Sequence, residues 1–342
     1  MNDTKKKKKS PVPVTIITGF LGSGKTTLMN RILTGPEGNR IAVIQNEFAS
    51  EGIDQELLAG DVPVIKEMSN GCICCTVFDD LIPVLEELNQ RREDFDRVLI
   101  ETTGLADPVP VARTFFTSVR LQQDFRLDGI VTLVDAAHLF NQIDEAPEAE
   151  SQIASADLIV LNKADLTNDD GIQKAKSKIR TLNKEAEILV TKYADFELEK
   201  IFEISALHPD QLKTLEAELT ADHAHNHSHD HDHHHHGHTH EPGVDSVSLL
   251  VEGTINLERL DAWMNMLQAL SGNKLYRTKG ILNLKNEDRK FIFQSVFGVM
   301  QGDFGNPWKP NENRTSKFVL IGKDLNEKLL KDGFGACLDQ EG

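Results

Sequence analysis

Residues 19–26 read GFLGSGKT and are the strongest indication of the fold. They fit G-x-x-x-x-G-K-[ST], a glycine-rich loop whose backbone N–H groups surround phosphate oxygens. The flanking sequence suits such a loop, because residues 14–17 are typical of a buried strand and residues 25–33 of a helix. The glycines allow a close backbone approach, and a helix N-terminus favours anions. The stretch therefore predicts a phosphate-loop nucleotide site in an α/β domain.

Within this loop, two residues are expected to take part in catalysis. Lys25 would reach the β- and γ-phosphates, and the Thr26 hydroxyl would bind Mg²⁺. The residues of the loop predicted to bind nucleotide are Gly19, Phe20, Leu21, Gly22, Ser23, Gly24, Lys25, Thr26 and Thr27.

A second nucleotide motif follows the predicted strand 97–100. Glu101 ends this strand, and the sequence continues as TTGLADP to residue 108. We expect Glu101 to hold Mg²⁺ or its water and the Gly104 N–H to contact the γ-phosphate, so that the segment switches between ordered and released forms. Many GTPases have D-x-x-G here, whereas this chain has E-T-T-G.

A third motif predicts the base. Residues 158–161 are typical of a buried strand, and they lead into Asn162-Lys163-Ala164-Asp165, an N-K-x-D motif. The Asp165 carboxylate can accept hydrogen bonds from N1–H and the exocyclic amine of guanine, whereas adenine presents an acceptor at N1. The motif favours GTP over ATP. Ser205, after the apolar stretch 201–204, is predicted to supply a backbone contact to the guanine oxygen.

Three of the four cysteines are clustered in the run Cys72-Ile73-Cys74-Cys75. The chain has no disulfide framework, signal peptide or long apolar run, which predicts a reducing, cytoplasmic setting and no membrane partner. Thiolates suit Zn²⁺, with Co²⁺ and Ni²⁺ as weaker candidates. Three thiolates leave a tetrahedral ion one ligand short, which favours a transfer site with Glu47, water or a client protein as fourth ligand. The alternative is a buried cysteine cluster that packs in the core and binds no metal.

Histidine and charge are unevenly distributed along the chain. The tract from His223 to His240 contains eleven of the 13 histidines, and its composition predicts a disordered arm that binds Zn²⁺, Ni²⁺ or Cu²⁺ weakly. His138 and His208 lie outside it and are interpreted as ordinary surface or hydrogen-bonded histidines. The net charge of −17 argues against nucleic acid as a partner. Lys5–Lys9 is interpreted as a solvated tail, although nuclear localisation through it stays open.

Strands alternate with helices up to residue 220, which predicts a mostly parallel sheet covered on both faces. Beyond the histidine tract we expect a small α+β domain, with one strand over 290–299 and with Trp263, Phe291, Phe293 and Trp308 in its core. The predicted divisions are a basic tail (1–12), a GTPase domain (13–220), a histidine-rich linker (221–244) and a C-terminal α+β domain (245–342).

Together these motifs resemble the CobW-type phosphate-loop GTPases, a branch of the metallochaperones, and most of all the zinc-regulated GTPase metalloprotein activators. The resemblance rests on GFLGSGKTT (19–27), NEF (46–48), EGID (51–54), GCICCT (71–76), ETTGLADP (101–108), NKAD (162–165), the histidine-rich linker and YRTKGIL (276–282). It implies GTP hydrolysis, a metal-transfer role for the cysteine motif and a client metalloprotein recognised by the C-terminal domain. The family often has N-E-F-G-E where this chain has N-E-F-A-S, so one glycine and one acid are missing.

The order of the motifs suggests a mechanism in which nucleotide controls metal affinity. If the Gly104 segment and the Glu47 loop order together around GTP, residues 72–75 would enter or leave metal-binding geometry, and linkage makes the effect reciprocal. A zinc-buffering protein, and a GTPase that inserts cobalt or nickel, remain alternatives. The sequence does not determine the client or the oligomeric state.

Overall fold

The computed structural model describes residues 10–35, 40–45, 64–67, 73–184, 186–202, 204, 244–271, 274–296, 299–310 and 312–339. The chain forms two compact units, one of residues 1–152, 156–173 and 187–204 and one of residues 153–155, 174–186 and 205–342. Helices in the described residues are too short or too polar to cross a membrane. The predicted domain boundaries stay predictions.

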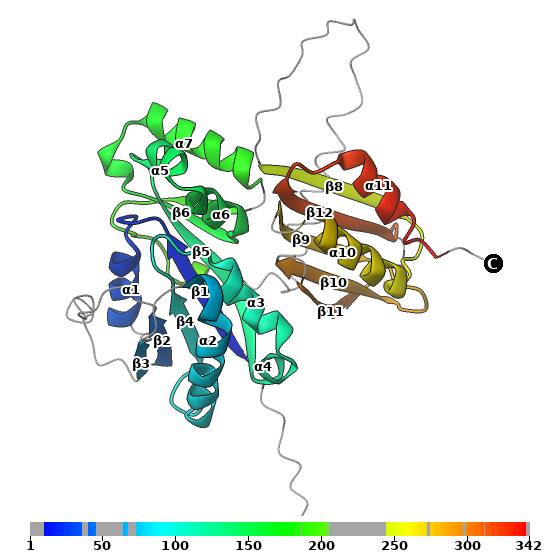
Figure 1. Ribbon diagram of the computed structural model, residues 1–342, viewed down its shortest axis with the longest axis horizontal. Coiled ribbons are helices and arrows are strands. Elements are labelled where there is room, and N and C mark those ends of the chain that lie inside the picture. The colour runs from blue at the N-terminus through cyan, green and yellow to red at the C-terminus, as the bar shows by residue number, and fades with distance from the viewer. Residues whose placement is uncertain are drawn as a thin grey trace, which may run out of the picture. The chain divides into compact units, whose positions relative to one another are not determined.

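The elements up to residue 204 alternate between strands and helices (Figure 1). They are β1 (Val12–Gly19), α1 (Lys25–Thr34), β2 (Ile41–Gln45), β3 (Val64–Glu67), α2 (Ile73–Gln90), β4 (Arg97–Glu101), α3 (Val109–Thr117), α4 (Val119–Asp124), β5 (Phe125–Asp135), α5 (Leu139–Glu145), α6 (Pro147–Ser155), β6 (Leu158–Asn162), the 3₁₀ helix η3 (Ala164–Leu166), α7 (Asp169–Leu182), β7 (Glu187–Val190) and α8 (Glu199–Phe202).

The strands form one seven-stranded sheet in the order β3-β2-β4-β1-β5-β6-β7. Every pairing in it is parallel, so the prediction of a mostly parallel sheet in a phosphate-loop domain is confirmed. The strand order reverses direction at β1, and ligands of open α/β sheets bind at such a switch point, beyond the carboxyl ends of the strands. The loop after β1 therefore occupies the expected nucleotide position.

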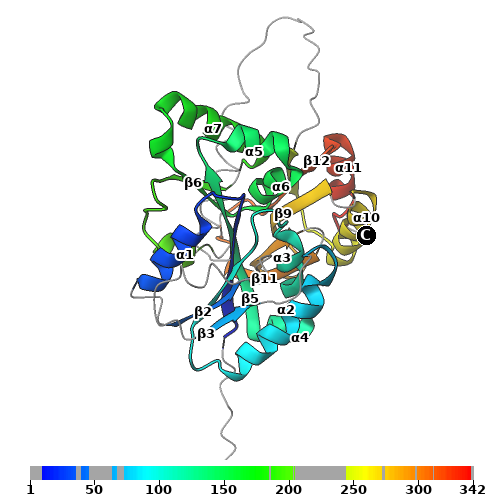
Figure 2. The same cartoon turned by 60° about the vertical axis from the view of Figure 1, so that its left-hand side comes forward.

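Both faces of this sheet are covered, which explains why its strands are apolar without alternation. Figure 2 shows α1 on one side of the sheet and α2, α3 and α4 on the other. Ile17 of β1 packs with Leu28, Met29 and Ile32 of α1 in one buried cluster, while its neighbour Ile16 is equally buried. Because successive strand residues face opposite sides, this burial requires helices on both.

The second sheet is antiparallel and has the strand order β11-β10-β9-β12-β8. Its elements are β8 (Val244–Glu252), α10 (Leu257–Ser271), β9 (Leu275–Leu282), β10 (Arg289–Val296), β11 (Val299–Pro307), β12 (Thr315–Lys323) and α11 (Glu327–Gly335). An aromatic core joins helices and strands: Phe318 lies 5.5 Å from Trp263, 4.8 Å from Phe293 and 5.0 Å from Phe334, between ring centroids. The predicted α+β class is confirmed.

The prediction of a single strand over 290–299 was wrong. The structure has a hairpin there, in which β10 pairs with β11 from Val296↔Val299 outward. Apolar residues continue from β10 to Val299 and Met300, so composition indicated one strand that ended there, and the glycines at 302 and 305 of β11 gave no strand signal. Of the expected core aromatics, Trp263, Phe293 and Trp308 are buried, and Phe291 packs partly buried against the core.

Cys337, the isolated fourth cysteine, belongs to this core. It is 1% exposed, its Sγ donates to the Gly333 carbonyl over 3.3 Å, and burial raises the pKa of its thiol to about 11. A thiol held protonated in this way is a poor metal ligand, because metals bind the thiolate.

The buried carboxyl group of Asp128, in β5, has a shifted pKa that makes the stability of the fold depend on pH. Desolvation raises its pKa to about 6, although Arg126 donates to Oδ1 over 3.0 Å; Oδ2 is buried and has no hydrogen-bond partner within the described part of the chain. Between about pH 4 and pH 6 the Asp128 carboxyl group is therefore protonated in the folded chain and ionised in the unfolded chain. The free energy of unfolding falls as pH rises through this window.

We expect Asp128→Asn to raise the free energy of unfolding at pH 8 and to leave it nearly unchanged near pH 4. Urea denaturation of both proteins across this range measures the difference, and a difference independent of pH would contradict the assignment.

Candidate functional site

The carboxyl ends of the seven parallel strands meet at one edge of the sheet. The residues that end them are Gly19, Gln45, Glu67, Glu101, Asp135, Asn162 and Val190. The phosphate loop, the E-T-T-G segment and the N-K-x-D motif all start from this edge. Parallel pairing thus brings together motifs that lie more than 100 residues apart in the sequence.

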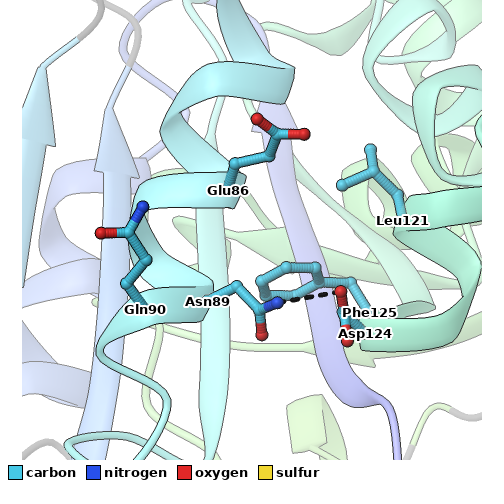
Figure 3. A pocket seen from close by; sticks show the side chains of 6 residues that line it. All are labelled: Glu86, Asn89, Gln90, Leu121, Asp124 and Phe125. Atoms are coloured by element: carbon cyan, nitrogen blue, oxygen red, sulfur yellow. Dashed lines mark hydrogen bonds between the residues drawn. The ribbon is translucent and has the colours of Figure 1, made fainter.

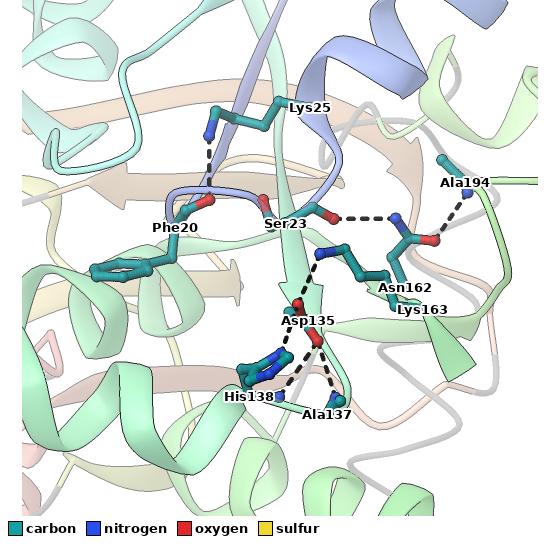
Figure 4. A network of polar contacts seen from close by, with 9 residues as sticks. All are labelled: Phe20, Ser23, Lys25, Asp135, Ala137, His138, Asn162, Lys163 and Ala194. Carbon is teal, nitrogen blue, oxygen red and sulfur yellow. Dashed lines mark hydrogen bonds and ion pairs between the residues drawn. The ribbon is translucent and has the colours of Figure 1, made fainter. Parts of the chain in front are cut away.

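Three glycines of the phosphate loop have a positive φ, and Gly22, with φ 72°, is one of them. Gly19 has φ 140° and Gly24 has φ 109°, a region that L-residues rarely adopt. A side chain at Gly24 would also collide with the Asn162 amide. Lys25 begins α1, and its Nζ donates to the carbonyl oxygens of Gly19 over 2.7 Å and Phe20 over 3.2 Å (Figure 4). The lysine therefore lies along the loop that would hold the phosphates.

The start of α1 fits an anion. Its first turn has no acidic residue, and its N-cap, Gly24, has no side chain that could cap the helix. Ser23 is fully buried in the loop, and its Oγ has no hydrogen-bond partner among the described residues. A buried hydroxyl of this kind, beside a helix N-terminus, favours a phosphate ligand. The residues present thus fit the nucleotide that the motif predicts.

Glu101 lies between the loop strand and β2. It is the register partner of Ile17 on β1 and of Gln45 on β2, and its Oε2 accepts a hydrogen bond of 2.8 Å from Gln45 Nε2. The next residue, Thr102, donates from Oγ1 to Thr18 Oγ1 over 2.8 Å. These contacts hold the Glu101 carboxylate beside Ile17, two residues before the phosphate loop begins. A carboxylate oxygen is a ligand that suits Mg²⁺.

The segment after Glu101 is held against the loop. A Cβ placed on Gly104 would lie 2.7 Å from the backbone nitrogen of Leu21, so only glycine allows this approach. Gln152 of α6 donates through Nε2 to the Gly104 carbonyl over 3.1 Å and to the Ala106 carbonyl over 2.9 Å. Asp107 is largely buried, which raises its pKa, and its Oδ1 accepts from Ser151 Oγ over 3.1 Å. Helix α6 thus holds the expected γ-phosphate contact in place.

The Asp135 carboxylate is hydrogen-bonded to several groups next to the N-K-x-D motif (Figure 4). Its Oδ2 lies 2.9 Å from Lys163 Nζ and 3.1 Å from His138 Nδ1, and its Oδ1 accepts from Ala137 N over 2.9 Å. Burial acts to raise the pKa of Asp135, but these hydrogen bonds outweigh it and the pKa lies below its ordinary value. Lys163 has a left-handed backbone, φ 58°, and is anchored by this carboxylate.

Asn162 joins three parts of the site. Its Nδ2 donates to the Ser23 carbonyl of the phosphate loop over 3.0 Å, and its Oδ1 accepts from Thr191 Oγ1 over 3.2 Å and from Ala194 N over 2.8 Å. Arg31 of α1 donates to the Ala194 carbonyl from the other side. The loop after β7 is consequently held against both the phosphate loop and the N-K-x-D motif.

A cavity of about 620 Å³ opens beside the exposed Asp165. Its lining combines polar groups with the apolar side chains of Val190 and Ile172 and consists of Ala164, Asp165, Thr167, Asp169, Ile172, Val190, Thr191, Lys192 and Asp195. This volume is in the range of pockets that take small ligands. Within the described part of the chain, it is the hollow that adjoins the predicted base-binding residues.

A smaller hollow of about 180 Å³ lies elsewhere on the first unit. Figure 3 shows Asn89 of α2 pointing toward Asp124 and Phe125, and Asn89 Nδ2 donates to Asp124 Oδ2 over 2.8 Å. Phe125 begins β5, so this hollow is at the amino ends of the strands. It is therefore on the opposite edge from the nucleotide motifs.

Two of the four predicted zinc ligands lie outside the described residues. These are Cys72 and Glu47, and the same holds for Ser205, the tract 223–240 and Lys5–Lys9. Cys74 and Cys75 fall on the helical backbone at the start of α2, and their side chains are outside the description. Among the described side chains there is no group of three His, Cys, Asp or Glu arranged to hold a metal. The zinc site stays a prediction.

The structure adds residues that the motifs did not indicate. The loop Thr191–Asp195 borders the base cavity, where sequence reasoning placed Ser205. The sequence indicated a strand over 187–191 at this place. It did not indicate the conformation of the loop that follows, in which Tyr193 and Ala194 each have a positive φ of 53°. Gln45, Asp135 and Gln152 were missed because isolated polar residues at strand and helix ends carry no motif.

The bridging role of Asn162 predicts a measurable effect on nucleotide binding. Asn162→Ala removes the donor to Ser23 and leaves the Ala194 N–H without its acceptor, a cost of about 1–3 kcal/mol per buried group. We expect nucleotide affinity to fall at least tenfold, measured by competition with a fluorescent nucleotide. Asn183→Ala is the matched control, because Asn183 is also buried and its Nδ2 donates to the Ile153 carbonyl over 2.9 Å. A similar loss of affinity in both variants would show that Asn162 acts only through stability.

Comparison with known proteins agrees with this geometry. Residues 13–190 match the family described as CobW/HypB/UreG, nucleotide-binding domain, and residues 244–338 match the cobalamin synthesis protein cobW C-terminal domain. The chain is similar to the zinc chaperone YjiA of Escherichia coli K12, with 32% identity over 95% of this chain and 98% of the relative. It is also similar to zinc-regulated GTPase metalloprotein activator 1 of Schizosaccharomyces pombe, with 39% identity over 60% of this chain and 52% of the relative.

A solved structure supports the same assignment over both units. The crystal structure of Zn(II)-bound YjiA GTPase from E. coli is 28% identical, covers 97% of this chain and all of its own, and has a TM-score of 0.70. The phosphate loop, the E-T-T-G segment and the N-K-A-D motif on one parallel-sheet edge belong to the same architecture. The chain is a member of the CobW/HypB/UreG family of phosphate-loop nucleotide-binding proteins.

Proposed function

We propose that the chain is a GTP-hydrolysing metallochaperone, which binds zinc at the Cys72-x-Cys74-Cys75 motif and transfers it to a client metalloprotein under nucleotide control. The observation that carries the nucleotide part is the Asn162 bridge, because it holds the phosphate loop and the N-K-A-D motif at one site. The names of the relatives, a zinc chaperone and a zinc-regulated GTPase activator, support the metal part.

The roles of the nucleotide residues follow from their positions. Lys25 would neutralise the β- and γ-phosphates, and the N–H groups at the start of α1 would bind their oxygens. Thr26 and Glu101 would hold Mg²⁺, which supplies charge neutralisation of the transferred phosphoryl group when bound. The Gly104 N–H would contact the γ-phosphate. Gln152, by fixing the Gly104 and Ala106 carbonyls, would set where that contact lies.

Guanine would occupy the cavity at Asp165. The carboxylate would accept from the guanine N1–H and amine, and the backbone of Thr191–Asp195 would face the guanine oxygen. Val190 and Ile172 offer apolar surface to the base. We place this backbone contact in the Thr191–Asp195 loop in preference to Ser205, because the loop borders the cavity and is hydrogen-bonded to Asn162.

Zinc is the proposed cargo. Cys72, Cys74 and Cys75 would supply thiolates, and Glu47, water or a client residue would complete the tetrahedral set. The motif lies between the phosphate loop and Glu101 in the chain, and helix α2 begins within it. Strand β3 ends at Glu67, five positions before Cys72, so a nucleotide-dependent change at the strand edge would reach the cysteines through few residues. The tract 223–240 would capture zinc weakly and supply it to this site.

Base specificity tests the role of Asp165. Asp165→Asn presents an amide donor where the carboxylate accepted, which suits the carbonyl at C2 of xanthine and leaves the guanine amine without an acceptor. We expect GTP affinity to fall at least a hundredfold, about 2.8 kcal/mol, and xanthosine triphosphate affinity to rise. Asp169→Asn, another aspartate lining the cavity, should leave the preference unchanged. Unchanged GTP affinity in Asp165→Asn would remove this residue from the base site.

Zinc affinity in the two nucleotide states tests the gating mechanism. The histidines of the tract 223–240 are replaced by serine, and Zn²⁺ affinity is measured by chelator competition with Mg²⁺–GDP or a Mg²⁺–GTP analogue. We expect at least a tenfold difference, about 1.4 kcal/mol of coupling, and its loss when Cys72, Cys74 and Cys75 become alanine. Cys337→Ala is the control, since that thiol is buried in the C-terminal core. Equal affinities would leave a zinc buffer as the better description.

A further inference from the structure

Gln45 and Glu101 end two neighbouring strands, and their side chains meet there. Gln45 is the last residue of β2, Glu101 is the last of β4, and they are register partners in the parallel ladder. Gln45 Nε2 donates to Glu101 Oε2 over 2.8 Å. Gln45 is only 8% exposed and Glu101 is half-buried, so the hydrogen bond is partly shielded from water. Neither the family motifs nor the roles proposed above use this residue.

The backbone leaves Gln45 little freedom. β2 is paired on both sides, with Glu67 of β3 and Glu101 of β4 opposite Gln45 in the ladder. On its other side, Glu101 is paired with Ile17, two residues before the phosphate loop. The amide therefore approaches Glu101 from a fixed position, on the side away from β1. A hydrogen bond of this geometry restricts the rotamer of the carboxylate.

The chemistry of the amide suits this position. Glutamine donates a hydrogen bond to an ionised carboxylate without adding charge, and such charge-assisted bonds are stronger than neutral ones. A carboxylate at position 45 would instead place two negative charges side by side, and an apolar residue would leave Glu101 without this donor. The glutamine thus orients the acid while its negative charge stays available to a cation.

We propose that Gln45 is a positioning residue, whose amide holds the Glu101 carboxylate in the orientation that binds the Mg²⁺ accompanying the nucleotide. This inference rests on the proposed function, in which Glu101 and Thr26 hold that ion. Hydrogen-bond partners of metal-binding groups typically change metal affinity by about 10- to 100-fold when removed. Gln45 acts through Glu101 and has no direct part in phosphoryl transfer.

The test measures Mg²⁺ binding instead of turnover. Gln45→Met keeps the length of the side chain and removes its donor, and Gln268→Met, at a half-buried glutamine of α10, is the matched control. The full-length proteins are loaded with an N-methylanthraniloyl GTP analogue, and fluorescence is followed while Mg²⁺ is added after EDTA treatment. We expect the half-saturating Mg²⁺ concentration to rise at least tenfold in Gln45→Met, with nucleotide affinity in EDTA and thermal stability nearly unchanged. Gln268→Met should titrate like the wild type.

A double-mutant cycle separates positioning from general structure. In a Glu101→Gln background, Gln45→Met should cause no further change in the Mg²⁺ titration, because the group it orients is gone. The same tenfold shift in both backgrounds, or no shift in either, would overturn the inference. A wild type that binds the analogue without any Mg²⁺ dependence would instead overturn the proposed roles of Glu101 and Thr26.

Discussion

The edge of the parallel sheet that carries the phosphate loop and the N-K-A-D motif depends on the hydrogen bonds of the Asn162 side chain. One amide group connects the phosphate loop, the end of β6 and the loop after β7, which come from three distant parts of the sequence. Asn162 is 2% exposed, so water could not take the place of these hydrogen bonds if they were lost. The same amide accounts for the glycine at position 24, since any side chain would enter its space. The phosphate loop and the N-K-A-D motif are thereby part of one hydrogen-bonded network.

The other strand ends follow the same principle. Three further pairs at this edge join side chains from different strands or loops: Gln45 with Glu101, Thr102 with Thr18, and Asp135 with Lys163. Buried polar groups of this kind are stable only when they are hydrogen-bonded, so the ladder register sets which pairs form. The E-T-T-G segment is held by a helix, through Gln152 of α6. A displacement of α6 would therefore act on Gly104 directly.

Much of the site was predictable from local sequence because its motifs combine residue type with spacing. GFLGSGKT needs its glycines for a left-handed backbone, and N-K-A-D follows a buried strand, so both were placed at strand ends correctly. The pairing of β10 with β11 was not predicted, because apolar residues continue from the end of β10 into the start of β11. The Thr191–Asp195 loop was missed for a different reason. Its position beside Asp165 results from the β6–β7 pairing and from Asn162, neither of which leaves a signal in the loop's own composition.

By itself, the sequence determined that the chain has a phosphate-loop α/β domain followed by a small α+β domain, and it located the motifs predicted to bind phosphate, magnesium and guanine. It could do so because these features depend on short stretches whose backbone conformation and chemistry are local. Only the tertiary structure decided which polar side chains serve those motifs: Gln45 beside Glu101, Gln152 beneath Gly104 and Asp135 beneath Lys163. Such pairs form between residues separated by 28 to 56 positions, and strand order and register alone bring them within hydrogen-bonding distance.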